Sequence, residues 1–320
     1  MINVDNLTKF YGQVCALREV SFQVRKGEIL GMLGPNGAGK TTTMRILTCY
    51  LTPTAGTIRV KDLDIKEDPL EIKNLIGYLP ESAPLYPDML TYEYLQYVAA
   101  MRGLSGPDKR TRIHEIADLC GLNEVMHMHV RECSRGYKQR IGLAHAMMSD
   151  PEILVLDEPT SGLDPNQIAE IRTIIREIGR EKTILFSTHI LSEAEATCDR
   201  IVIIDGGQVV ADGTAESLRA STADENLIYL GLLEAEYEDV RRTVSGLPGV
   251  RDVQLLTNTE ADAPQTTVRV QLVCDRDLRP EIYRAIKQES WIVIEFTRER
   301  RSLETVFRSL THAGESVKEM

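Results

Sequence analysis

The sequence lacks any apolar run long enough to cross a lipid bilayer, because no stretch approaches the ~18 consecutive apolar residues of a spanning helix. Residues 1–5 also lack the basic start and long apolar segment of a secretory signal peptide. We therefore expect neither a membrane span nor an export signal, and any role at a membrane is expected to depend on a partner protein.

Closely spaced cysteines and an excess of positive charge are absent too. The 6 cysteines include no C-x-x-C pair, which favours a reduced, cytosolic protein. Lysine and arginine number 37 against 48 acidic residues, giving a net charge of −11. Nucleic-acid binding normally needs a basic face, so no nucleic-acid partner is expected. With 320 residues, of which 42% are hydrophobic, the chain is long enough for two domains with packed cores.

The most informative segment is glycine-rich. Residues 34–42 read G-P-N-G-A-G-K-T-T and match the phosphate loop G-x-x-x-x-G-K-T. An apolar stretch at 28–33 predicts a buried strand before it, and 43–47 predict a helix after it. The glycines let the backbone wrap around an anion and point N–H groups at it. The residues expected to bind the phosphates are Gly34, Pro35, Asn36, Gly37, Ala38, Gly39, Lys40, Thr41 and Thr42. Lys40 is expected to reach the β- and γ-phosphates, and the Thr41 hydroxyl to bind Mg²⁺.

Two acids follow a second apolar run. Residues 153–156 predict a buried parallel strand, and Asp157 and Glu158 come directly after it. Ligands of α/β sheets bind at this end of the strands. Asp157 is expected to hold Mg²⁺ through water, and Glu158 to polarise an attacking water as general base. A structural role for both acids is disfavoured, because burying unpaired charge is costly.

The remaining pattern predicts an α/β domain with a helical insertion. Short strands are expected at 2–7, 21–24, 57–60, 76–80 and 201–204, and a mostly helical segment at about 87–149. A further strand at 183–187 ends at His189, which is placed to reach a γ-phosphate. Between the strands predicted at 153–156 and 183–187, a tight turn at 161–165 precedes a helix from Asn166 to about Arg180.

Two positions keep alternative interpretations. Tyr11 lies in a predicted loop at 9–12, where it either stacks on an adenine ring or packs on the sheet. Ser134 is a natural N-cap for a helix, and its hydroxyl either meets a phosphate or only starts that helix.

A change of composition near residue 218 predicts a second domain. A linker at 220–224 is followed by strands at 227–232, 250–256, 267–273 and 291–295, and by helices at 237–245, 279–289 and 302–310. The order β-α-β-β-α-β plus a last helix predicts a small ferredoxin-like α+β domain over 220–320, after a first domain over 1–219. No motif ties it to chemistry, and a role in dimerisation or stability is favoured over ligand sensing.

Taken in order, these motifs resemble the ATP-binding subunit of an ABC transporter over roughly residues 1–220. Residues 34–42 are similar to Walker A, and 153–157 to Walker B followed by the catalytic Glu158. Ser161 to Asp164 resemble the D-loop, and His189 the switch histidine. The resemblance implies a P-loop NTPase of the ABC type that binds ATP with Mg²⁺ and hydrolyses it.

Two motifs depart from the family pattern. The signature normally reads Leu-Ser-Gly-Gly-Gln, but residues 133–137 read Cys-Ser-Arg-Gly-Tyr, which keeps Ser134 and Gly136 and places Tyr137 at the glutamine. Glu81 falls at the Q-loop position, where it keeps oxygens for Mg²⁺ or water but loses the amide donor. The resemblance also favours Tyr11 as the aromatic that stacks on adenine. These variants are similar to bacterial drug-exporter and gliding-motility ATP-binding subunits.

The resemblance further implies partners and a location. ATP is expected to lie between Walker A of one subunit and Ser134 of a second ABC ATPase subunit, in a head-to-tail dimer, most simply a homodimer. Closure is expected to pull on a multi-span membrane permease docked near Glu81 and the helical insertion, which places the chain on the cytoplasmic face of the cell membrane. A soluble ABC ATPase acting on nucleic acid or ribosomes is the alternative. A small-molecule P-loop kinase leaves the signature and D-loop motifs unexplained.

Overall fold

A computed structural model of the chain describes residues 1–221, 226–256, 267–298, 304 and 307. The chain divides into two compact units, an N-terminal unit of Met1–Glu216 and a C-terminal unit built within Ser217–Val306, and each is described by itself. Among the described residues, no helix has both the length and the apolar character that crossing a membrane requires.

A six-stranded sheet runs through the N-terminal unit in the order β10-β9-β3-β8-β7-β6. Its strands are β3 (Ile29–Leu33), β6 (Ile76–Leu79), β7 (Ile153–Asp157), β8 (Thr183–Thr188), β9 (Arg200–Asp205) and β10 (Gln208–Gly213). Strands β9, β3, β8, β7 and β6 are mutually parallel, and β10 is antiparallel to β9. Every residue of β3, β7 and β8 is buried, because both faces of the parallel sheet are covered.

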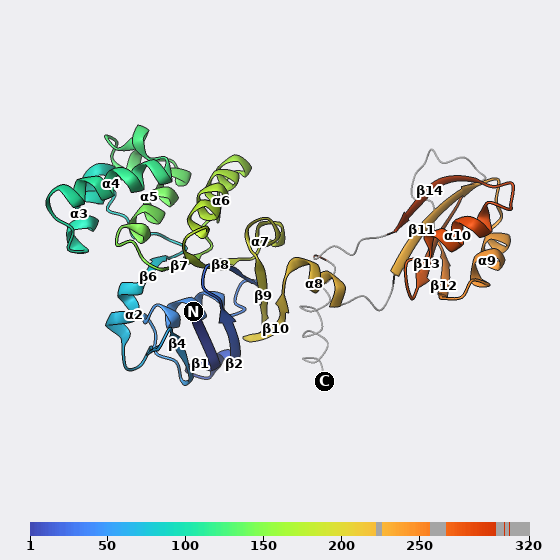
Figure 1. Cartoon of the computed structure of the whole chain (residues 1–320), viewed down its shortest axis with the longest axis horizontal. Coiled ribbons are helices and arrows are strands. Elements are labelled where there is room, and N and C mark those ends of the chain that lie inside the picture. Colours follow the sequence, from blue (N-terminus) through green and yellow to red (C-terminus); the bar gives the residue numbers. More distant parts are fainter. Residues whose placement is uncertain (222–225, 257–266, 299–303, 305–306, 308–320) are drawn as a thin grey trace. The chain divides into compact units, whose positions relative to one another are not determined.

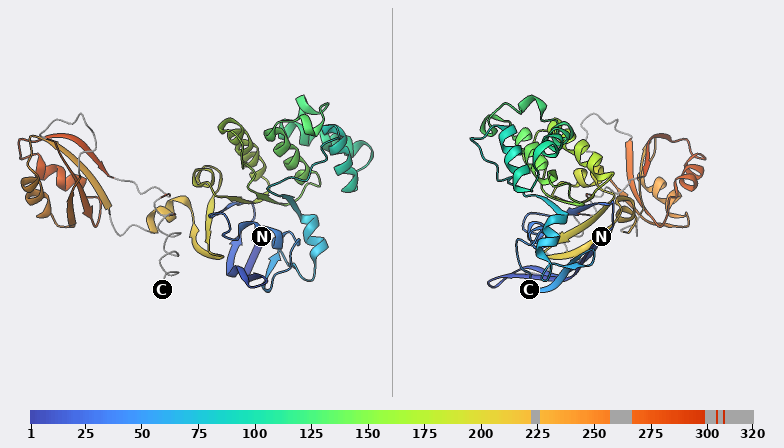
Figure 2. Two further views of the ribbon diagram at one scale, coloured as in Figure 1. Left: turned by 180° about the vertical axis from the view of Figure 1, so that it is seen from behind. Right: turned by 60° about the vertical axis from the view of Figure 1, so that its left-hand side comes forward.

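An antiparallel sheet covers one side. Its order is β2-β1-β4-β5, with β1 (Ile2–Tyr11), β2 (Val14–Val24), β4 (Ala55–Val60) and β5 (Leu63–Asp64). Buried aliphatic side chains from both sheets and from α1 (Lys40–Leu47) form one hydrophobic cluster. The parallel sheet lies between this antiparallel sheet and helices α3 to α6, as two opposite views agree (Figures 1 and 2).

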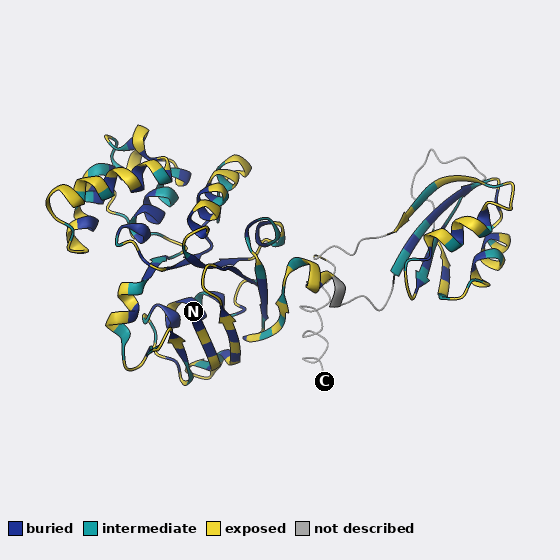
Figure 3. Cartoon of the chain, in the orientation of Figure 1, coloured by how far each residue is buried: buried dark blue, intermediate teal, exposed yellow. Residues whose placement is uncertain are grey.

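Helices cover the other side. They are α3 (Thr91–Met101), α4 (Gly106–Cys120), α5 (Arg135–Met147) and α6 (Pro165–Gly179), with the shorter α2 (Pro69–Leu75), α7 (Leu191–Thr197) and α8 (Ala215–Ser221) elsewhere in the chain. In α6 the isoleucines at 171, 174, 175 and 178 share one buried face. Figure 3 shows the same division in α3 to α6, which carry exposed residues beside buried ones.

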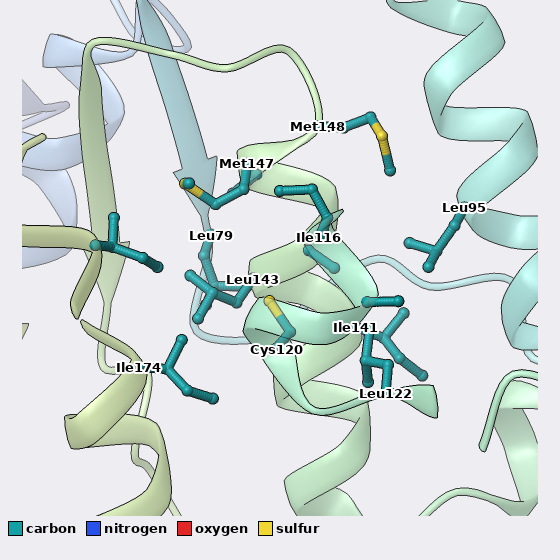
Figure 4. Close-up of a cluster of buried hydrophobic side chains, with 14 of the residues drawn as sticks. Leu79, Leu95, Ile116, Cys120, Leu122, Ile141, Leu143, Met147, Met148 and Ile174 are labelled. Atoms are coloured by element: carbon teal, nitrogen blue, oxygen red, sulfur yellow. The ribbon is translucent and has the colours of Figure 1, made fainter. Parts of the chain in front are cut away.

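The three helices α3 to α5 fall within the predicted helical segment 87–149. Their buried faces meet α6 and the end of β6 in a dense aliphatic cluster, part of which Figure 4 shows. Leu79, Ile116, Leu143 and Ile174 come from four different elements and point into it. This cluster fixes the helices to the edge of the sheet on which the site is built.

The C-terminal unit is an α+β fold. Its elements are β11 (Asn226–Leu233), α9 (Tyr237–Ser245), β12 (Val250–Leu255), β13 (Thr267–Cys274), α10 (Arg279–Ile286) and β14 (Ile292–Arg298). The strands form an antiparallel sheet in the order β12-β13-β11-β14, and both helices contribute to its core. The described elements follow the expected order β-α-β-β-α-β; the ferredoxin-like assignment stays a prediction.

Several local predictions were wrong, and others concern residues outside the described part of the chain. The loop predicted at 9–12 is wrong up to Tyr11, because β1 continues to this residue and pairs it with Val14 across a tight turn. Helices α2 and α7 and strand β10 were not predicted, since each is short and weakly periodic. The helix predicted at 302–310 and the loop at 258–265 lie outside the described residues, apart from positions 304 and 307.

The separate clusters of the two units lead to a stability prediction. Leu143 is 1% exposed, so Leu143→Ala is expected to lower the free energy of unfolding of the N-terminal unit by about 2–5 kcal/mol. Leu70→Ala, at a residue that is 71% exposed, is the control and is expected to change it by less than about 0.5 kcal/mol. Urea unfolding followed by circular dichroism measures both.

The one tryptophan of the chain, Trp291, packs against the core of the C-terminal unit, so its fluorescence reports on that unit. Leu143→Ala is expected to leave the midpoint of the fluorescence transition unchanged. Equal shifts of both transitions would show that the two units unfold together.

Candidate nucleotide-binding and hydrolysis site

The phosphate loop connects β3 to α1, as the strand–loop–helix expectation requires. Gly37 and Gly39 have φ of 82° and 109°, in the left-handed region that favours glycine. A Cβ on Gly34 would lie 2.2 Å from the carbonyl oxygen of Ile204, so this position also needs glycine. The loop leads into the N-terminus of α1, where free N–H groups and the helix dipole attract anions.

Lys40 is the first residue of α1, and its side chain is buried in the loop. Its ammonium group donates to the carbonyl oxygens of Gly34 (2.8 Å) and Pro35 (3.1 Å). It also lies 3.4 Å from Oε1 of Glu158. The lysine therefore connects the phosphate loop to the acidic end of β7.

Asp157 is the last residue of β7 and lies opposite Ser187 on the parallel neighbour β8. Its Oδ1 accepts from the hydroxyls of Ser187 (2.7 Å) and Thr41 (3.2 Å). Burial raises the pKa of Asp157 and the nearby Glu158 adds to the rise, whereas these two hydroxyls lower it. The second oxygen, Oδ2, is buried and has no hydrogen-bond partner among the described residues.

Glu158 begins the loop after β7 in a strained conformation, with φ of 47°. Its N–H donates to the Ser187 hydroxyl at 2.9 Å, and its Oε2 lies 2.9 Å from Nδ1 of His189, which follows β8. Its side chain is therefore held between His189 and Lys40.

These groups border a cavity of about 400 Å³. Its lining residues come from distant parts of the sequence: Ala16, Asn36, Gly37, Gly39, Lys40, Thr41, Thr42, Glu81, Glu158, Ser161 and His189. The fold thus brings the phosphate loop, Glu81, Glu158, Ser161 and His189 together in one place.

The oxygen atoms beside this cavity fit a magnesium ion. Mg²⁺ prefers carboxylate and hydroxyl oxygens together with substrate phosphates. The Thr41 hydroxyl, the Asp157 carboxylate with its unpartnered Oδ2, and the Glu81 carboxylate at the cavity wall provide such oxygens.

Other predicted site residues lie outside the cavity lining. Tyr11 is 44% exposed at the end of β1, and the Lys9 ammonium lies 5.4 Å from the centre of its ring. Asp164 caps α6, accepting from the N–H groups of Asn166 and Gln167 at 3.0 Å each. The adenine role of Tyr11 stays a prediction.

The signature residues start helix α5. Ser134 is its N-cap and accepts from the N–H of Tyr137 at 3.3 Å, while Gly136 lies so close to Gln167 that a Cβ would meet its side chain at 2.8 Å. The Arg135 guanidinium likewise lies against Gly162, in the loop after Glu158. The signature and the D-loop therefore contact each other within the chain.

Ser187 was missed by the sequence reasoning, although its hydroxyl connects Asp157 to the backbone of Glu158. A signal was present: Ser187 and Thr188 are polar residues at the end of an apolar strand that was expected beside the acidic one.

The fold and this arrangement define a P-loop ATPase, and comparison with known proteins gives its family. The sequence profile described as "ABC transporter" matches residues 17–161, and one of an AAA domain matches 129–194. The ABC transporter ATP-binding protein NatA of Bacillus subtilis is 40% identical over 219 residues, covering 68% of this chain and 89% of NatA. The daunorubicin resistance ATP-binding protein of Streptomyces coeruleorubidus is 32% identical over 319 residues, covering 99% of this chain and 98% of that protein.

Solved structures agree. The ATP-binding subunit of an ABC transporter matches with a TM-score of 0.63 and 31% identity, over 69% of this chain and 92% of that one. A dimeric ATP-binding cassette with bound ADP and phosphate matches with a TM-score of 0.61 and 25% identity, over 67% and 98%. The chain belongs to the ABC transporter ATP-binding proteins, a family of ATPases, and the predicted family and P-loop fold are confirmed.

The raised pKa of Asp157 predicts a cost in stability. The folded state binds the Asp157 proton more tightly than the unfolded state does. The ionised carboxylate therefore lowers the free energy of unfolding at pH values above the pKa of the folded state. Below the pKa of the unfolded state, Asp157 is protonated in both states and this cost disappears. Without nucleotide and Mg²⁺, Asp157→Asn is therefore expected to unfold at higher urea concentration than wild type at pH 7. The difference is expected to shrink as the pH falls towards about 4. Asp62→Asn, on an exposed turn, is the control; a less stable Asp157→Asn at pH 7 would contradict the argument.

Proposed function

We propose that this chain is the ATP-hydrolysing subunit of a drug exporter, acting as a dimer on a separate membrane permease at the cytoplasmic face of the cell membrane. The proposed ATP hydrolysis is supported above all by the position of Glu158, which contacts Lys40 and His189 beside the phosphate loop. The proposed role in drug export is supported by the similarity to relatives named for transport and drug resistance.

Hydrolysis uses groups that already lie together. The Lys40 ammonium reaches the β- and γ-phosphates of ATP, which replace Glu158 as its partner. The freed Glu158 carboxylate takes a proton from the attacking water, and His189 orients Glu158 and the γ-phosphate. Thr41 and Asp157, with Glu81 in the lining of the same cavity, would hold Mg²⁺, which would neutralise charge on the phosphates.

In the proposed dimer, the signature residues of one subunit contact the nucleotide bound by the other. Ser134 and Gly136 do not line the cavity of their own chain, and in the proposal they contact the nucleotide of the partner subunit, with Asp164 and Ser161 at the interface. The dimeric cassette with ADP and phosphate among the similar structures supports this arrangement. Driving such a closure requires ATP to bind the closed state better by several kcal/mol, on the order of 5 for a nearly complete shift.

The permease is proposed to dock in a groove of about 800 Å³ between α2 and the helical segment. Pro80 and Ser82 line this groove, while Glu81 between them lines the nucleotide cavity. Glu81 is therefore well placed to couple the two sites. The groove is largely apolar but also contains Arg45, Lys73 and Arg102, which favour a docking segment with acidic side chains.

Drug export is the proposed direction and cargo class. The daunorubicin resistance protein is similar over nearly the whole chain, including the C-terminal unit. We propose that residues 220–320 form an accessory domain, with dimerisation or stability as its role.

Glu158→Gln tests the hydrolysis step and the dimer together. The variant is expected to hydrolyse ATP about 10²–10⁴-fold more slowly, because an amide cannot accept the proton from water. It is also expected to convert from monomer to dimer when ATP is added, which size-exclusion chromatography with light scattering measures. Lys40→Ala is the matched control: it loses the cation for the phosphates, so neither turnover nor an ATP-dependent dimer is expected.

If Glu158→Gln hydrolysed ATP at the wild-type rate, Glu158 would not be the general base. A dimer with and without ATP would assign dimerisation to the C-terminal unit. A monomer in both conditions would mean that closure needs a different subunit or the permease.

Lys73→Glu tests the groove. Lys73 is exposed on α2, so the reversed charge is expected to weaken co-purification of a multi-span membrane protein from detergent-solubilised membranes while leaving ATP hydrolysis intact. Lys26→Glu, at an exposed lysine outside the groove lining, is the control. Unchanged co-purification by Lys73→Glu would argue against docking in this groove.

A further inference from the structure

Glu193, on helix α7, is a buried acid that the proposed hydrolysis mechanism does not use. The residue is 4% exposed. One of its oxygens, Oε1, is buried without a hydrogen-bond partner among the described residues. A carboxyl group in such a position costs free energy, so its contacts call for an explanation.

The other oxygen accepts two hydrogen bonds, one from the loop after β7 and one from the last residue of β8. Oε2 of Glu193 accepts from the hydroxyl of Thr160 at 2.7 Å and from the hydroxyl of Thr188 at 2.8 Å. Both threonines are buried, at 5% and 2% exposure. The Thr188 hydroxyl also accepts from the N–H of Ile190 at 3.0 Å. One carboxylate oxygen thus joins the loop after β7 to the end of β8, where the loop that carries His189 begins.

These two loops carry the pair at the centre of the site. Thr160 follows Glu158 by two residues, and Thr188 directly precedes His189. Within the strand ends that lead to these loops, Ser187 of β8 joins Asp157 to the backbone N–H of Glu158. Side-chain hydrogen bonds at the ends of β7 and β8 therefore precede the Glu158–His189 contact of 2.9 Å, and those of Glu193 connect the same two segments a second time.

We propose that Glu193 is a positioning residue for ATP hydrolysis, which holds the loops of Glu158 and His189 at the separation that their contact requires. It does not touch the nucleotide cavity, whose lining excludes it. The strained φ of Glu158 makes such support necessary, because a strained loop relaxes unless its surroundings fix it. The proposal rests on the roles of Glu158 and His189 given above.

Two matched pairs of variants test this role. Glu193→Leu removes the acceptor at similar volume, whereas Glu193→Gln keeps an oxygen for both hydroxyls. Thr160→Val removes one donor, and Thr160→Ser keeps it; this second pair serves if Glu193→Leu fails to fold. Ser192→Ala, at the exposed neighbour of Glu193 on α7, is the control. Steady-state ATPase kinetics, nucleotide affinity and the unfolding temperature are measured for each.

We expect Glu193→Leu to lower kcat by about 10–100-fold, because small displacements of catalytic groups have effects of this size. KM and the Kd for ATP are expected to stay at the wild-type values, since the phosphate loop is not touched. Thr160→Val should lower kcat in the same way but less, while Glu193→Gln, Thr160→Ser and Ser192→Ala keep it. In combination with His189→Ala, Glu193→Leu should cause little further loss, because both act through one pair.

A merely structural role gives a different pattern. Wild-type kcat in Glu193→Leu and Thr160→Val would overturn the proposal. A loss of kcat that matches the loss of folded protein, or that multiplies fully with the loss from His189→Ala, would overturn it as well. Glu158→Gln is assayed in parallel: if it hydrolyses ATP at the wild-type rate, the proposed function itself has failed, whereas failure of the Glu193 and Thr160 variants alone removes only the positioning role.

Discussion

The parallel pairing of β7 with β8 is the constraint on which the rest of the site depends. It sets Asp157 opposite Ser187, so that Glu158 and His189 leave the sheet side by side. Because the acids leave at a buried edge, their charge has to be met within the fold. The hydroxyls of Thr41 and Ser187, which donate to Asp157, and the cation of Lys40 beside Glu158 provide this compensation.

The position of β3 extends the same constraint to the phosphate loop. Strand β3 lies between β8 and β9, and Leu33 at its end pairs with Thr188. The loop that follows β3 therefore begins beside the loop that carries His189. This order of neighbouring strand ends places Lys40 within 3.4 Å of Glu158 although the two are far apart in the sequence.

The sequence was sufficient where chemistry is local and insufficient where it depends on packing. The glycines and Lys40, and the apolar runs that end in Glu158 and His189, are local patterns, and they led to the P-loop fold that the relatives confirm. Tyr11 was placed in a loop because a strand end is decided by pairing with Val14 rather than by the residues themselves. Ser187 and Glu193 depend on contacts between strands and helices that no linear spacing reveals. The nucleotide contacts proposed for Ser134 would involve a second subunit, so a single chain cannot contain them.

Asp157 and Glu193 are both buried, and each has one carboxyl oxygen without a hydrogen-bond partner among the described residues, but they differ in what surrounds them. Asp157 accepts from the hydroxyl of Thr41, which lines the cavity, and there a cation and phosphates are expected to compensate its charge. Glu193 accepts from the hydroxyls of Thr160 and Thr188, neither of which lines the cavity, so its cost persists whether or not nucleotide is bound. Ligands that bind only the folded state stabilise it in proportion to their concentration and affinity. Binding of substrate therefore offsets the free-energy cost of burying Asp157. The cost of burying Glu193 is not offset in this way, and we attribute it to the geometry that Glu193 maintains between Glu158 and His189.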